Sequence, residues 1–159
     1  MLVTNLPNQY NYTTWDEVFQ SENGQQVGWA RETVSLTGTA GIYQIGTLVI
    51  LSADNKSITV PNNHAAVAAA AASGKIAILA GKEIKGDCSN GFDPNIVELK
   101  TGYLTEPKAI VVFDARNGGA IGDAEIKFPS DSNAANKEAI FTRLKVENGF
   151  KVLKQAVKG

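Results

Sequence analysis

The chain has 159 residues, 43% of them hydrophobic, and its 15 basic and 16 acidic side chains leave a formal net charge of −1. This length suits one ordinary domain with a substantial core, and the balanced charge argues against a nucleic-acid-binding protein, which needs a basic excess or a basic stripe. The sequence contains no run of 18 apolar residues, so we expect no transmembrane helix and no membrane partner.

Residues 1–27 are rich in Asn, Gln, Thr and aromatic side chains and show no sustained periodicity. We interpret them as an extended N-terminal arm, poorly ordered by itself, that precedes a β-rich domain over residues 28–159. Residues 1–7 have neither the basic start nor the apolar stretch of a signal peptide, so we expect none. The aromatic side chains of the arm either pack back onto the domain or bind a partner, and the sequence leaves both open.

Two strands are predicted next, at residues 31–36 and 42–51, because apolar and polar residues alternate there between turn-forming clusters. Val34 and Leu36 share one face of the first strand, and the second strand runs through an internal Gly46. We expect both to be antiparallel and half-buried. Residues 57–60 predict a short edge-like strand that stops at Pro61.

A short helix is predicted at residues 64–72, where an alanine-rich run follows the capping residues Asn62 and Asn63 and precedes Ser73 and Gly74. A helix with such small side chains buries little area, but it suits close packing against another chain or strand. Residues 75–80 are apolar on both faces and predict a buried central strand, and residues 86–94 predict a loop.

Two further strands, at residues 95–100 and 107–113, a hairpin-type turn at 116–119 and strand-like alternation over 124–128 come next. A second helix begins at a cap on Ser132 or Asn133 and runs to about residue 145, with one apolar face. The residues of that face are Ala135, Ala139, Ile140 and Leu144. Asn148 and Gly149 end it before a last strand at 150–153. The predicted fold is mainly β (α+β): a small antiparallel β-barrel or β-tulip-like domain with one or two short helices and the N-terminal arm.

Residues that carry catalytic or metal chemistry are scarce. His64 is the only histidine and Cys88 the only cysteine, which leaves no disulfide framework and too few ligands for zinc. Sequence distance alone leaves a Cys88–His64 dyad open, but no orienting motif supports it, and we expect His64 to be a surface or capping residue. The glycine-rich stretch near Gly74 lacks the P-loop pattern, and residues 118–122 lead into a strand where a dinucleotide fingerprint needs a helix. We therefore expect no cofactor, no metal and no enzymatic activity.

The order of the segments carries a further signal. RETVSLT (31–37) is followed by IGTLV (45–49), KIAILA (75–80), AIVVF (109–113), KEAIFTRL (137–144) and NGFKVL (148–153). Over residues 28–153 this order resembles that of the lambda-type head decoration proteins of tailed bacteriophages. The N-terminal arm and the insertion-like segment 98–107 depart from the family pattern.

The resemblance implies a structural protein that binds the outer surface of an expanded capsid at local three-fold positions and stabilises the head against the pressure of packaged DNA. Its implied partners are the major capsid protein and two further copies of itself in a homotrimer. It would be made in the host cytoplasm and reside on the outside of the virion.

We expect the arm to make the capsid contacts by adding as a strand to an exposed sheet edge of the capsid protein. On this interpretation, deletion of residues 1–20 weakens or abolishes capsid binding and leaves the stability of the body nearly unchanged. The candidate capsid-binding residues are Val3, Leu6, Tyr10, Tyr12, Trp15 and Phe19.

Two other functions stay open. Trp15, Trp29, Tyr10 and Tyr12 would serve as sugar-stacking platforms in a non-catalytic carbohydrate- or surface-binding β-module of a tail or another assembly. A small trimeric β enzyme with an active site between subunits would need a cluster of carboxylates and polar residues that the sequence does not display. A major capsid gene next to this gene would favour a decoration protein over the carbohydrate- or surface-binding module.

Overall fold

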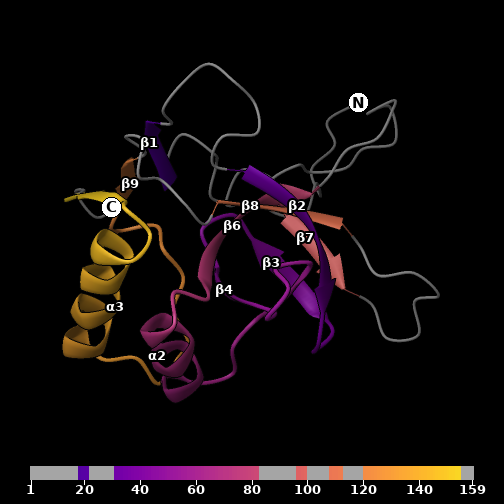
Figure 1. Cartoon of the computed structure of the whole chain (residues 1–159), viewed down its shortest axis with the longest axis horizontal. Helices are drawn as coiled ribbons and strands as arrows, with labels where there is room; N and C mark the ends of the chain where they lie inside the picture. The colour runs from indigo at the N-terminus through magenta and orange to yellow at the C-terminus, as the bar shows by residue number, and fades with distance from the viewer. Residues whose placement is uncertain (1–17, 22–30, 83–95, 100–107, 113–119, 155–159) are drawn as a thin grey trace, which may run out of the picture.

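The computed structural model describes residues 18–21, 31–82, 96–99, 108–112 and 120–154. The strands are β1 (Phe19–Ser21), β2 (Arg31–Thr37), β3 (Gly41–Gln44), β4 (Leu48–Leu51), β5 (Ser57–Thr59), β6 (Ile76–Lys82), β7 (Ile96–Leu99), β8 (Lys108–Val112), β9 (Ala120–Gly122) and β10 (Lys151–Leu153), and the helices are α2 (His64–Ala72) and α3 (Ala134–Val146). The described part of the chain is therefore mostly β with two helices and several sheets (Figure 1), which confirms the predicted α+β class. The predicted loop at 86–94 and the predicted turn at 116–119 lie outside the described residues.

Five strands pair in a ring. β2 pairs with β5 and β8, β8 pairs with β6, β6 with β4, and β4 with β5. The β2–β5 pair is parallel and the other four are antiparallel, so the antiparallel prediction is wrong for that one pair. The prediction of an edge-like strand at 57–60 is also wrong, because β5 lies between two partners. Pro61 follows the strand, where it removes no donor from the ladder.

The predicted strand over residues 42–51 is two strands that belong to different sheets. β3 pairs with β7 in a two-stranded sheet, whereas β4 belongs to the ring. A tight turn separates them, in which both the backbone N–H and the hydroxyl of Thr47 donate to the Gln44 carbonyl, at 3.2 and 2.7 Å. Gly46 has φ +91°, a conformation that glycine adopts at little cost. The turn redirects the chain although the apolar pattern continues through it.

A third sheet joins the two ends of the described chain. β1 pairs antiparallel with β9, and β10 pairs parallel with the other side of β9. Figure 1 shows this sheet beside the C-terminal end of α3. Residues 124–128, predicted to be strand-like, contribute only an isolated bridge between Lys127 and Thr47.

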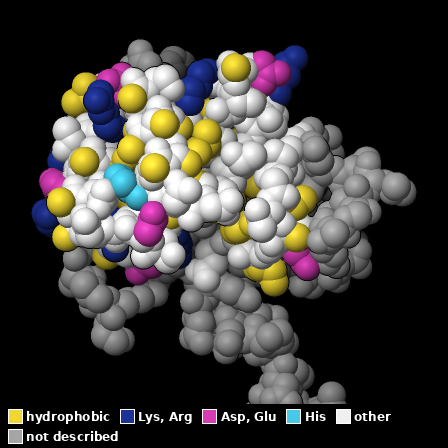
Figure 2. Space-filling model, turned by 90° about the horizontal axis from the view of Figure 1, so that it is seen from below, with side chains coloured by type: hydrophobic (Ala, Val, Ile, Leu, Met, Phe, Trp, Pro, Cys, Tyr) yellow, Lys and Arg dark blue, Asp and Glu magenta, His cyan; other side chains and the backbone are white. Residues whose placement is uncertain are grey.

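Both helices begin at asparagine caps, as predicted. The Asn63 side chain accepts from the backbone N–H of Ala66 at 2.9 Å, and Asn133 forms a reciprocal capping box with Asn136. α2 ends before Gly74, which has φ +68°. α2 packs beside α3, and Figure 2, which views the molecule from below, shows hydrophobic side chains scattered among polar ones on the part of the surface that the helices occupy.

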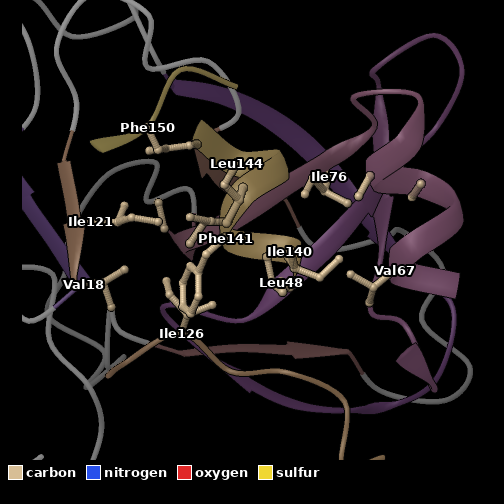
Figure 3. Close-up of a cluster of buried hydrophobic side chains, with 14 of the residues drawn as sticks. Val18, Leu48, Val67, Ile76, Ile121, Ile126, Ile140, Phe141, Leu144 and Phe150 are labelled. Atoms are coloured by element: carbon tan, nitrogen blue, oxygen red, sulfur yellow. The ribbon is translucent and has the colours of Figure 1, made fainter. Parts of the chain in front are cut away.

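The core consists of two clusters on either side of β6. Ile76, Ile78 and Ala80 face the first cluster, which the helices and the β1–β9–β10 sheet complete (Figure 3). Ala77 and Leu79 face the second cluster, between the ring and the β3–β7 sheet. β6 is therefore buried on both faces, as its sequence predicts.

The buried face of α3 differs in part from the prediction. Ile140 and Leu144 are buried as expected, and Phe141 joins them. Ala135 and Ala139 are exposed, so their assignment to the core face is wrong. The bulky Phe141 rotates the buried face away from the alanines, whose small side chains gain little from burial.

Candidate functional site

Val18 is the first residue that the structure describes. Its side chain is fully buried in the first core cluster, where Figure 3 places it beside Ile126 and Ile121. The Gly46 turn leaves room for it, since a Cβ on Gly46 would lie 3.0 Å from Val18 Cγ2. We call this arrangement of Val18, Gly46, Ile121 and Ile126 the Val18 socket.

β1 follows the socket and attaches this part of the chain to β9. Phe19 is paired with Ile121 and Ser21 with Ala120, with an irregularity between them. Of the six candidate capsid-binding residues, only Phe19 lies within the described chain, in β1. The other five, Val3, Leu6, Tyr10, Tyr12 and Trp15, lie outside the described residues, as does Trp29.

The folded body therefore begins earlier than the boundary placed after residue 27, because Val18 and β1 belong to it. A deletion of residues 1–20 removes a fully buried side chain and most of a paired strand. The expectation that such a deletion leaves stability unchanged is not compatible with this packing. A deletion that ends at residue 17 keeps Val18 and β1 in the chain.

Residues 125–127 close the socket, and hydrogen bonds of Lys127 hold them in place. Its backbone N–H donates to the Gly46 carbonyl at 2.9 Å, and its carbonyl accepts from Leu48 N–H at 3.1 Å. Its ammonium group donates to the carbonyl and carboxylate oxygens of Glu125, at 2.8 and 3.4 Å. Burial lowers the pKa of Lys127, and the opposing charge of Glu125 only partly offsets this. These bonds fix the position of the Glu125 carbonyl against the turn.

The exposed side of α2 is apolar. Val67, Ala70 and Ala71 face the core, and the four alanines on the remaining surface, Ala65, Ala68, Ala69 and Ala72, are exposed. The expectation that this helix packs closely against another chain stays a prediction.

His64 is the first residue of α2, and the contact that fixes it is made by its backbone. Its N–H donates to the Asp131 carboxylate at 2.8 Å, so the loop before α3 helps to cap α2. Cys88, its candidate dyad partner, lies outside the described residues. Within the ranges that the structure describes, no group of three or more His, Cys, Asp or Glu side chains is arranged to hold a metal ion.

Comparison with known proteins found no matching family model, no matching curated protein and no matching solved structure. Neither of the two described helices is long and apolar enough to cross a membrane.

Proposed function

We propose that this protein is a non-enzymatic decoration protein of a tailed-phage capsid. It binds the outer surface of the expanded head as a homotrimer at local three-fold positions, through the major capsid protein, and stabilises the head against internal DNA pressure. In this proposal, the ring of five paired strands corresponds to the β-barrel or β-tulip-like body expected of such a protein. The protein is then made in the host cytoplasm and carried on the outside of the virion.

The Val18 socket is the observation that carries the proposal. A segment that binds a capsid transmits load only if it is tied firmly to a rigid body. Val18 is fully buried and β1 is hydrogen-bonded to β9 directly after it, so the residues before position 18 start from a fixed point on a sheet. Those residues carry the aromatic side chains Tyr10, Tyr12 and Trp15.

Multivalency strengthens binding through this N-terminal segment, which we call the tether (residues 1–17). Three copies joined in one trimer present three tethers, and linked contacts exceed the affinity of one contact by roughly 10²–10⁴. Closed cyclic symmetry is the usual outcome for a homo-oligomer.

The test compares full-length protein with a variant that lacks residues 1–17 and therefore keeps Val18. Each is mixed with expanded heads assembled from the major capsid protein of the same phage, and binding is measured by co-sedimentation. Unexpanded heads and immobilised glycans serve as comparators. We expect the full chain to bind expanded heads only, and the shortened chain to lose binding while its thermal unfolding is retained.

Three results would count against the proposal. Binding of the full chain to glycans with no binding to expanded heads would favour a carbohydrate-binding module. Equal head binding by the full and shortened chains would show that residues 1–17 do not make the capsid contact. Hydrolytic activity that survives purification of the trimer would point to an enzyme.

A further inference from the structure

α3 has an exposed face of small, uncharged side chains opposite its buried face. Ala135, Ala139, Thr142 and Val146 are all exposed, and their spacing of four, three and four residues aligns them along one side of the helix. Val146 is 73% exposed, more than any other large hydrophobic side chain in the described ranges. A helix that faces water normally carries its charged residues on this side. We call the line of these four residues the α3 seam.

Three charged residues of α3 lie on the two flanks of the seam, whereas the fourth, Lys137, lies over the Phe128 ring on the buried side. Glu138 and Lys145 are seven positions apart and share one flank. Arg143 lies on the other flank, paired with Glu147 at 3.2 Å. An apolar line bordered by charges of both signs is the pattern of a helix that pairs with other helices.

We propose that the α3 seam is the contact between copies of this chain, with three α3 helices parallel around the three-fold axis. The proposal rests on the homotrimer of the proposed function and names the surface that forms it. In a parallel arrangement, a flanking residue meets the residue five positions further along in the next copy. Glu138 of one copy then meets Arg143 of the next, which is an attractive pair.

The position of α3 in the molecule supports this contact. Figure 1 shows α3 at the edge of the molecule, with α2 on its inner side. The seam spans about 16 Å at 1.5 Å per residue, and its alanines allow the axes to approach closely. Four small side chains over this length form a contact smaller than the roughly 800 Å² per partner of a standard stable interface. The trimer is therefore weak in dilute solution and forms at high concentration or on a surface that gathers the copies.

The parallel orientation follows from where β1 lies. β10 comes directly after α3, β9 pairs with β10, and β1 pairs with β9. β1, which directly follows Val18, thus lies toward the C-terminal end of α3 (Figure 1). Parallel helices place three sockets at one end of the trimer, so that all three N-terminal segments start toward one capsid surface. An antiparallel pair would direct them to opposite ends.

Disulfide trapping tests the seam without requiring a stable trimer. In a Cys88→Ser background, Val146→Cys is oxidised with diamide at high protein concentration, and Ile42→Cys, at the other exposed large hydrophobic residue (56% exposed), is the matched control. A parallel seam brings the residues at position 146 of neighbouring copies within disulfide reach. We expect covalent dimers for Val146→Cys at least about tenfold above the control. Equal yields, or none for Val146→Cys, would overturn the proposal.

Charge reversal tests the orientation. Glu138→Arg should weaken self-association about tenfold in sedimentation velocity, and Glu138→Arg with Arg143→Glu should restore it. In an antiparallel pair, Glu138 would meet Lys145 of the other copy. Rescue of Glu138→Arg by Lys145→Glu, and not by Arg143→Glu, would therefore refute the parallel trimer. If Glu138→Arg has no effect on self-association, the parallel trimer is refuted as well. Head binding is measured separately. If Val146→Cys forms covalent dimers but the protein does not bind heads, the decoration function is refuted and the α3 seam stands. If the protein binds heads but Val146→Cys forms no dimers, only the α3 seam is refuted.

Discussion

Replacement of Gly46 by alanine should destabilise the protein through two costs that act together. The first is the backbone, since φ +91° at this position costs an L-residue roughly 1–2 kcal/mol. The second is packing, because the new Cβ would overlap the Glu125 carbonyl oxygen and press on Val18 Cγ2. The carbonyl cannot retreat freely, since Lys127 Nζ donates to it at 2.8 Å. Overpacking of this kind costs about 1–3 kcal/mol, so we expect a total loss of about 2–5 kcal/mol.

Gly74→Ala is the control that separates these two costs. Gly74 also has positive φ, at +68°, but a Cβ there would meet no atom within 4 Å. It should therefore lose only the backbone contribution, about 1–2 kcal/mol. Urea unfolding measures both variants, and in a thermal melt each kcal/mol corresponds to roughly 2–4 °C for a chain of this size. If the two variants lose the same stability within about 0.5 kcal/mol, the packing argument for the Val18 socket is refuted.

Three further changes probe other contacts. Val18→Ala removes two methyl groups from a fully buried site and should cost about 1–3 kcal/mol in urea unfolding. Deletion of residues 1–17 should cost less than about 0.5 kcal/mol. A larger loss from the deletion would contradict the socket as the start of the body. Asp131→Ala removes the acceptor for the His64 N–H and should cost about 0.5–2 kcal/mol, and Asp131→Asn should recover most of that loss. Burial raises the pKa of Tyr43 above its usual 10.0, so the stability that its protonated form contributes is present below pH 10.0 and is lost as pH rises through the raised pKa. The stability difference between the wild type and Tyr43→Phe should therefore shrink above that pH, and a constant difference would contradict this.

The features that sequence predicts correctly depend on neighbouring residues. Asn63 and Asn133 cap the helices through side-chain bonds to backbone groups three positions ahead, which is a local rule. Val34 and Leu36 are buried because alternation assigns them to one face of one strand. The predicted α+β class follows from the sum of such local patterns.

The features that sequence misses depend on residues far apart in the chain. The apolar pattern runs through Gly46 without a break, and the turn there is formed against Glu125 and Lys127, which come much later. The parallel pairing of β2 with β5 is a choice of partner that neither strand encodes alone. Val18 lies in a segment whose sequence shows no apolar periodicity, so no pattern marks it as buried.

The attachment of β1 to β9 also sets an order of events during synthesis. Val18 and Phe19 leave the ribosome early, but their partners Ile121 and Ile126 are made only after most of the chain has been translated. Contacts of such large sequence separation form slowly, because the chain loses loop entropy before they stabilise it. The Val18 side chain therefore stays unpacked through most of translation, and one of the first core residues to be synthesised completes its packing among the last.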